Sequence, residues 1–282
     1  MQQLVKMLGF FMLMICAASV HALEKNVIRM GTLPWEDVIP VSGVTKRFLE
    51  KKGFSVELIQ LPDWGIAFTA LTRGDIDILV SHINYNTSDY WKKNLQRLEK
   101  VSIVSHGLRQ ALVVPDYMPI KSMEELNSIK DQVGARIIGI EPGSAIMRQA
   151  NHAIGAYGLQ YKLIDGSTAA MTAELESAIT RKSPIVAMLW QPSWMDQKFG
   201  VRYLDDPKEV FPPSQSYYWI ARKGFSNSHS RAREAIASVY VPINEITQMN
   251  AWFKDGMSWD QAIDKWWNNH NQLVDRWALL SN

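Results

Sequence analysis

The fold is decided by residues 27–80, in which segments typical of strands alternate with segments typical of helices. Three of them have strand length and are apolar or alternating: VIRMGTL (27–33), SVELIQL (55–61) and IDILV (76–80). Each gap between them carries a helical pattern that ends at a glycine, Gly53 or Gly74. This β-α-β-α-β order predicts a parallel sheet covered by helices.

A second set of the same kind occupies the middle of the chain. Strand patterns recur at 112–115, 136–140, 161–164 and 185–189, with helical patterns around 123–126, 145–157 and 168–181. A strand at 217–221 returns to the first set, and the last fifty residues read as helical. We therefore predict an α/β protein of two lobes, joined by two crossing strands, with a ligand cleft between the lobes that closes by a hinge motion.

This prediction divides the chain into four parts. The first part of lobe 1 covers 23–111, lobe 2 covers 112–214, and the second part of lobe 1, with the C-terminal helices, covers 215–282. Residues 1–22 are predicted to be a secretory signal peptide. They carry one charge, Lys6, then a short apolar run, then Val20-His21-Ala22 with small or short residues before the cleavage point.

Two other readings of this leader are weaker. A membrane anchor needs about 20 apolar residues, and the run is shorter than that. A lipid-anchored leader is disfavoured because Ile15 precedes Cys16, where Gly or Ala is expected. Cys16 is the only cysteine, so the mature protein is predicted to have no disulfide, and we expect it to be soluble outside the inner membrane.

Charge and motifs narrow the function classes. The chain has 30 Lys and Arg against 28 Asp and Glu, which gives no reason to expect nucleic acid as a partner. No hydrolase, zinc-protease, phosphate-loop or dinucleotide motif occurs, and the histidines show no metal-ligand spacing. We expect a binding protein that is not an enzyme and has no cofactor, although a periplasmic enzyme on a two-lobed fold stays an alternative.

Three stretches carry a resemblance to a known family. They are IGIEPGSAIM (138–147), GSTAAMTAE (166–174), and WQPSWM (190–195) continuing to YLDDP (203–207). The chain resembles the substrate-binding proteins of ABC importers for glycine betaine, choline and carnitine. The resemblance implies the two-lobed periplasmic fold, a monomer in the periplasm, and an ABC permease and ATPase as partners. It also implies that lobe closure captures a quaternary ammonium ligand, which aromatic faces hold because it has no N–H to donate.

The resemblance also assigns ligand-binding residues. Trp190, at the end of a strand, stands where the family has a cage tryptophan. Trp35 and Asp37, after the first strand, match the loop of choline-type members. Gly143, Ser144 and Ala145 open a helix whose free N–H groups meet the ligand's carboxylate in the family, in keeping with the anion preference of helix N-termini.

The sequence departs from the family pattern at several of these positions. Ile83 and Ser144 stand where relatives place tryptophan, Gln110 where choline-type members place tyrosine, and Ser193 where some place histidine. Other rings could complete the cage, and the candidates are Trp64, Tyr85, Tyr217, Tyr218 and Trp194. Alternatively, the polar residues His82, Gln110 and Glu141 suit a ligand with N–H donors, for example an amino acid such as histidine.

Overall fold

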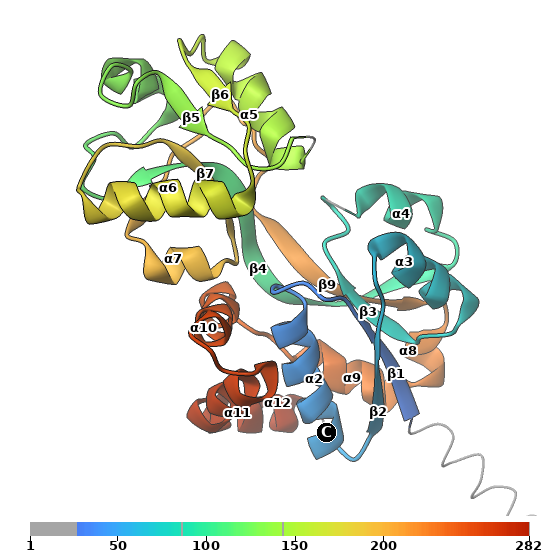
Figure 1. Cartoon of the computed structure of the whole chain (residues 1–282). Coiled ribbons are helices and arrows are strands. Elements are labelled where there is room, and N and C mark those ends of the chain that lie inside the picture. The colour runs from blue at the N-terminus through green and yellow to red at the C-terminus, as the bar shows by residue number, and fades with distance from the viewer. Residues whose placement is uncertain (1–26, 86, 143, 282) are drawn as a thin grey trace, which may run out of the picture. The chain divides into compact units, whose positions relative to one another are not determined.

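The computed structural model describes residues 27–85, 87–142 and 144–281, so the predicted signal peptide and Gly143 lie outside the described residues. The chain forms two compact units (Figure 1). Unit 1 consists of the described parts of Met1–Val104, Tyr217–Tyr240 and Ile263–Asn282, and unit 2 of Ser105–Ser216 and Val241–Ala262. The α/β fold class predicted from the sequence is confirmed.

Unit 1 is built on the strands of the first β-α-β-α-β set. Its sheet has the order β2-β1-β3-β9, in which β1 pairs in parallel with β2 and β3, and β9 is antiparallel to β3. The strands are β1 (Val27–Thr32), β2 (Ser55–Gln60), β3 (Ile78–Ser81) and β9 (Gln215–Arg222). The helices are α2 (Ile39–Lys51), α3 (Trp64–Arg73), α4 (Ser88–Lys93), α8 (Phe225–Ser228), α9 (Ser230–Ser238) and α12 (Asn271–Leu280).

Local chemistry explains where α3 begins and ends. The Asp63 side chain accepts a hydrogen bond from the Ile66 N–H at 2.8 Å, which satisfies one of the free donors of the first turn. Gly74 ends the helix in the left-handed conformation with φ 83°. Trp64 is therefore the first residue of α3, and it lies at the same end of unit 1 as the carboxyl ends of β1 and β3.

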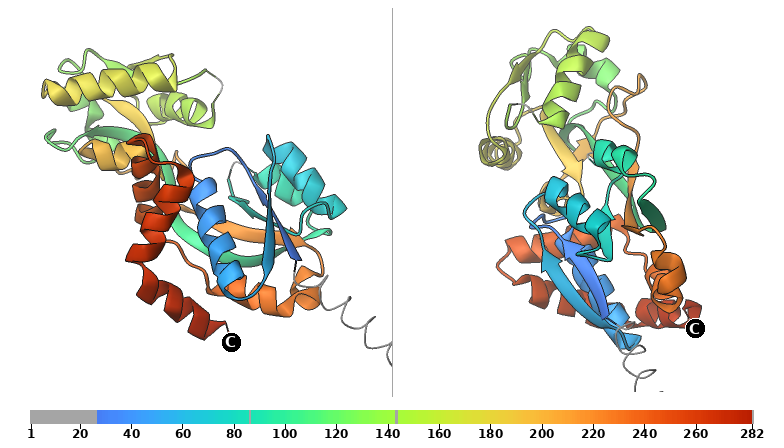
Figure 2. Two further views of the ribbon diagram at one scale, coloured as in Figure 1. Left: turned by 60° about the horizontal axis from the view of Figure 1, so that its bottom comes forward. Right: turned by 90° about the vertical axis from the view of Figure 1, so that its right-hand side faces the viewer.

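The part of the C-terminal helices that belongs to unit 1 packs along α2, as the left-hand view of Figure 2 shows. Phe48 of α2 meets Trp277 of α12 edge to face at 5.6 Å, and Lys51 pairs with Asp275 at 2.7 Å. Gly43 allows this close approach, because a Cβ there would overlap the Ile263 side chain of α11 (Trp259–Asn269). The tryptophans Trp266 and Trp277 are buried in this packing, as expected for core residues.

Unit 2 has a mixed sheet of order β4-β7-β5-β6. Strand β8 pairs with the C-terminal residues of β4, Val113 to Pro115. Its strands are β4 (Leu98–Pro115), which begins in unit 1, β5 (Arg136–Ile138), β6 (Lys162–Ile164), β7 (Ala187–Gln191) and β8 (Val201–Tyr203). Its helices are the 3₁₀ helix η1 (Met123–Ile129), α5 (Ala145–Ala156), α6 (Thr168–Thr180), α7 (Trp194–Lys198) and α10 (Ile243–Lys254).

The units differ in two respects from the predicted lobes. Unit 2 includes Val241–Ala262, which the sequence analysis placed in the first lobe with the other C-terminal helices. The physical reason is packing: α10 lies against α7, where the Lys254 ammonium is 5.0 Å from the centre of the Trp194 ring. The predicted crossing at residue 112 also falls inside β4, whose chain passes from unit 1 to unit 2 at Ser105.

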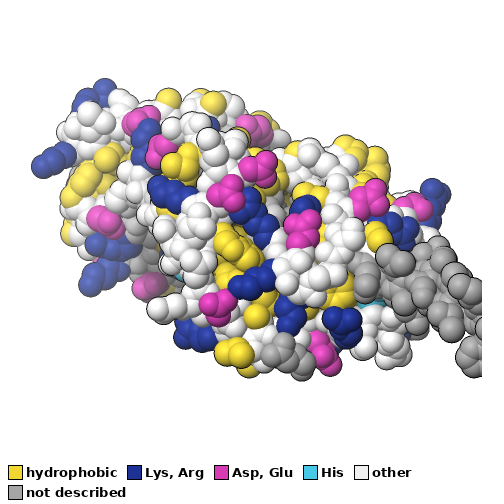
Figure 3. Space-filling view, turned by 90° about the horizontal axis from the view of Figure 1, so that it is seen from below, with side chains coloured by type: hydrophobic (Ala, Val, Ile, Leu, Met, Phe, Trp, Pro, Cys, Tyr) yellow, Lys and Arg dark blue, Asp and Glu magenta, His cyan; other side chains and the backbone are white. Residues whose placement is uncertain are grey.

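The structure shows the charge distribution on the surface and the hydropathy of the helices. On the face shown in Figure 3, acidic and basic side chains are interspersed and neither sign dominates. None of the helices in the described part of the chain combines the length and apolar character that a bilayer crossing needs.

Candidate functional site

Four side chains gather at the carboxyl ends of the unit 1 strands, and we call them the aromatic–acid cluster: Asp37, Trp64, His82 and Tyr217. Asp37 follows β1, His82 follows β3, and Tyr217 belongs to β9. The antiparallel register of β3 and β9 pairs Ser81 with Tyr218, so the next residues outward, His82 and Tyr217, come side by side.

A chain of contacts links the four. The Tyr217 hydroxyl donates a hydrogen bond to Asp37 Oδ2. The ring centres of Tyr217 and His82 are 5.6 Å apart, and the His82 ring meets the Trp64 ring edge to face at 5.0 Å. Asp37 does not cap α2, because the N-cap residue of this helix is Val38 and no side chain caps it.

Burial sets the charges of this cluster. Tyr217 is fully buried, which raises its pKa far above the ordinary value, and the Asp37 carboxylate raises it further. Burial lowers the pKa of His82, although the nearby Asp37 carboxylate opposes this. At neutral pH the hydroxyl therefore stays a donor and the imidazole stays uncharged, which leaves Asp37 as the charged member of the cluster.

The other predicted residues of unit 1 lie apart from these contacts. Trp35, in the loop before Asp37, is 45% exposed. Tyr218 alternates to the opposite face of the sheet from Tyr217, where its hydroxyl accepts from Asn84 Nδ2 at 3.2 Å and its ring faces the Lys100 ammonium at 4.9 Å. Ile83, at the position of a family tryptophan, is buried in the core.

In unit 2, the predicted ligand-binding residue Trp190 lies in strand β7. It is the fourth residue of β7, pairs with Gln110 of β4 in the sheet register, and is half-buried against the core of the unit. Alternation places its neighbour Gln191 on the other face, where Arg109 Nε donates to Gln191 Oε1 at 2.8 Å.

A polar group that sequence reasoning missed lies beside Gln191. The Arg109 guanidinium stacks over the Tyr203 ring at 4.0 Å, and the Tyr203 hydroxyl donates to Asp196 of α7. Burial raises the pKa of Asp196 to about 6, and Oδ2 of this carboxylate has no hydrogen-bond partner among the described residues. No sequence motif predicts this group, because its members come from four separate elements, β4, β7, α7 and β8.

The turn before α5 holds the remaining predicted residues. Ser144 is the N-cap of α5 and Ala145 its first residue, so their backbone N–H groups stand at the positive end of a twelve-residue helix. The Ser144 hydroxyl does not cap the helix, and its oxygen is buried without a partner among the described residues.

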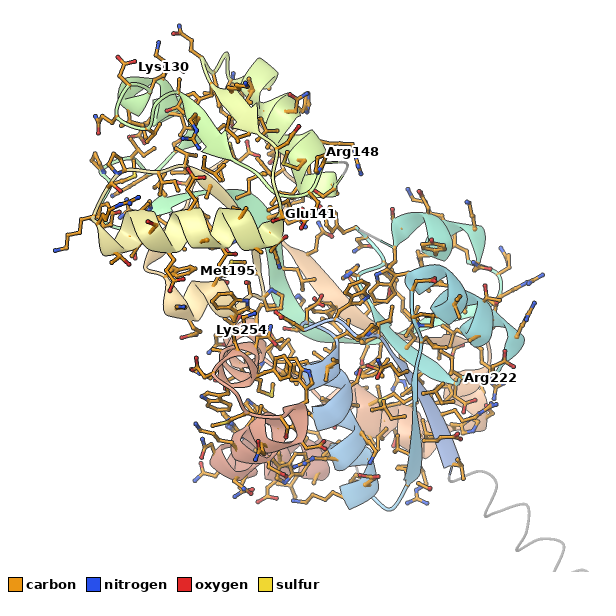
Figure 4. All side chains as sticks on the ribbon, in the orientation of Figure 1. Lys130, Glu141, Arg148, Met195, Arg222 and Lys254 are labelled. Atoms are coloured by element: carbon orange, nitrogen blue, oxygen red, sulfur yellow. The ribbon has the colours of Figure 1, made fainter. Side chains whose placement is uncertain are left out.

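Glu141 has a contact of its own. Its two carboxylate oxygens accept from the Thr168 N–H and from the Thr168 hydroxyl, both at 2.8 Å, and these bonds lower the pKa of Glu141. Figure 4 shows the residue at the N-terminal end of α6. These bonds tie Glu141 to the first residue of α6, next to the N-cap residue Ser167. Within the residues that the structure describes, no group of three His, Cys, Asp or Glu side chains is placed to hold a metal ion.

Known proteins similar to this chain are binding proteins. The glycine betaine/carnitine transport binding protein GbuC of Listeria monocytogenes is 33% identical over 151 residues, which are 52% of this chain and only 50% of that relative. The glycine betaine/proline betaine-binding periplasmic protein of Escherichia coli is 24% identical over 276 residues, covering 83% of this chain and 84% of that protein.

A solved structure of a binding protein has the same fold as this chain. Lactococcal OpuAC, in its closed-liganded conformation complexed with glycine betaine, matches with a TM-score of 0.70 and 25% identity over 89% of this chain and 99% of that one. The predicted resemblance is thereby confirmed. The family model described as the substrate binding domain of the ABC-type glycine betaine transport system matches residues 26–269, and the chain belongs to this family of transport receptors.

Proposed function

We propose that this chain captures a small quaternary amine of the glycine betaine, choline or carnitine type for an ABC importer. The observation that carries the ligand class is the aromatic–acid cluster. It joins one carboxylate, Asp37, to the rings of Trp64 and Tyr217 at the carboxyl ends of the unit 1 strands. Ring faces attract an alkylated ammonium by about 0.5–2 kcal/mol each, and a carboxylate adds a charge that needs no N–H partner.

The proposal gives unit 2 two tasks. Trp190, half-buried at the end of β7, contributes a further ring. Ala145, the first residue of α5, and the residues Gly143 and Ser144 that precede it in the sequence receive the carboxylate of a betaine. Trp35 also belongs to the proposed site, because a large ring that is 45% exposed two residues before Asp37 is available to a ligand.

The cellular setting follows from the same proposal. Residues 1–22 direct export and are removed, and the mature monomer works in the periplasm with a permease and an ATPase. It binds without catalysis and needs no cofactor. The support is the family membership and the E. coli relative, whose name describes a periplasmic protein.

A second candidate ligand is an amino acid. It is favoured by His82, a polar ring in the cluster, and by Ile83, which supplies no aromatic face. An amino acid would offer N–H donors to the Asp37 carboxylate, whereas a quaternary amine offers none.

The experiment is a thermal-shift panel on the mature protein with glycine betaine, choline, carnitine, proline betaine and the common amino acids. A ligand at 100 times its dissociation constant stabilises the protein by about 2.7 kcal/mol. We expect a shift with a quaternary amine that is lost in Trp190→Ala and in Asp37→Asn.

The matched control is Trp267→Ala, which removes a half-buried tryptophan from α11 and should keep the shift. A shift with amino acids only would replace the first candidate by the second. No shift with any of these compounds would refute both ligand classes.

A further inference from the structure

His82 is buried but incompletely satisfied. Its side chain is enclosed by Trp64 and Tyr217, the residue is only 5% exposed, and Nδ1 has no hydrogen-bond partner among the described residues. A protonated imidazole carries an N–H on both nitrogens, so protonation would bury an unpaired donor together with a charge. The surroundings of the ring therefore strongly favour its neutral form.

The charged and titratable groups around this ring can be named. The loop after β1 contributes Asp37, and β9 contributes Tyr217, whose hydroxyl binds that carboxylate. On α3, Trp64 does not titrate, and the Asp63 carboxylate caps its own helix. The Lys100 ammonium of β4 lies over the ring of Tyr218, on the opposite face of the sheet. Asp37 is the charge that acts on His82, and both a proton on this ring and a cation in the cluster would use it.

We propose that His82 determines cation affinity in the aromatic–acid cluster and couples cation capture to pH. The inference rests on the proposed function, because it takes the cluster as the seat of the cation. A neutral ring leaves the Asp37 charge to the ligand. A protonated ring places a second positive charge beside the ligand and competes for the same carboxylate, so acid releases the cation.

Linkage fixes the sign and the reciprocity of this effect. Cation affinity is complete at pH values above the pKa of His82 and falls as the pH decreases through it. The same factor by which protonation weakens the cation must appear as a lowering of the His82 proton affinity when the cation is bound.

The first test is calorimetric titration of the mature protein with choline, whose charge is permanent, at pH 8 and at one pH unit below the His82 titration midpoint that NMR gives for the ligand-free protein. We expect the dissociation constant of the wild type to rise at least tenfold, which corresponds to about 1.4 kcal/mol. His82→Phe keeps a ring between Trp64 and Tyr217 and retains Asp37. The affinity of this variant for choline should differ less than twofold between the two pH values. The control is His152→Asn, which replaces an exposed histidine of α5. Its affinity for choline should depend on pH as that of the wild type does.

The second test reads His82 directly, through the NMR titration of its ring proton with and without saturating choline. Choline should lower the midpoint of the titration, which a purely structural role would not do. If His82→Phe does not fold, His82→Asn serves in its place, since it also lacks the titrating group.

Each outcome decides the matter. A wild-type affinity that does not change between pH 8 and one pH unit below the His82 midpoint, or an acid loss that persists in His82→Phe, would overturn the role of His82 while leaving the ligand proposal intact. Absence of binding by choline and glycine betaine at pH 8 would overturn the proposed function and the inference together.

Discussion

Asp77 is predicted to be the side chain on which unit 1 most depends for its stability. It is 2% exposed and precedes β3, and its carboxylate accepts three hydrogen bonds from Arg29 of β1, from the backbone N–H at 3.0 Å and from the guanidinium at 3.1 and 2.9 Å. Arg222, at the end of β9, adds a fourth at 3.3 Å. One buried carboxylate therefore ties together three neighbouring strands.

Replacing it by Asn removes the charge and turns an amide N–H₂ toward two guanidinium groups. Breaking a buried ion pair costs about 3–5 kcal/mol. The side chains of Arg29 and Arg222 are 36% and 35% exposed and keep part of their hydration, so we expect a loss of about 2–4 kcal/mol for Asp77→Asn.

Urea unfolding at pH 7 measures this loss, with Asp75→Asn as the matched control, because Asp75 is an exposed aspartate two residues away. Burial alone would raise the pKa of Asp77, but the hydrogen bonds from Arg29 and Arg222 outweigh it and lower the pKa. The contribution of Asp77 is therefore complete above the unfolded pKa of about 3.9 and is lost as the pH falls through the folded value. A loss below 1 kcal/mol at pH 7, or equal losses in the two variants, would refute this account.

Two further predictions concern unit 2. Gly139→Ala should destabilise the protein by about 1–3 kcal/mol in urea unfolding, because the new Cβ would lie 2.7 Å from the backbone oxygen of Ile164 and 2.6 Å from the sulfur of Met147. Gly155→Ala, which meets no atom within 4 Å, is the control and should not lower stability. Asp196, whose pKa is raised to about 6, should make the wild type lose about 2 kcal/mol as the pH rises from 4 to 7, because its folded state holds the proton more tightly than its unfolded state. Asp196→Asn should lack this loss in unfolding experiments across that range, and an unchanged pH profile would contradict the prediction.

Much of the local structure could be read from the sequence. The helical pattern that ends at Gly74 agrees with α3, whose C-cap is Gly74, and the strands of the first set agree with β1, β2 and β3 within two residues at each end. These elements are specified locally, by caps, glycines and the period of apolar residues, so no knowledge of distant contacts is needed.

The contacts of individual side chains could not be read from the sequence in this way. Glu141 accepts two hydrogen bonds from Thr168, 27 positions further along the chain, and the sequence did not indicate this contact. The register of β9 on β3 brings Tyr217 to His82 and places Tyr218 on the other face of the sheet. A one-residue shift in a strand reverses the face, and register depends on pairing partners that a single sequence does not reveal.

By itself, the sequence determined the α/β class, the order of the elements and the family, because these follow from periodicity, caps and short contiguous motifs. Only the tertiary structure decided that Asp37 binds Tyr217, that His82 is enclosed and neutral, and that α10 joins unit 2. Each of these depends on burial or on contacts between segments far apart in the chain. Desolvation and pairing energies arise there only after the chain has folded.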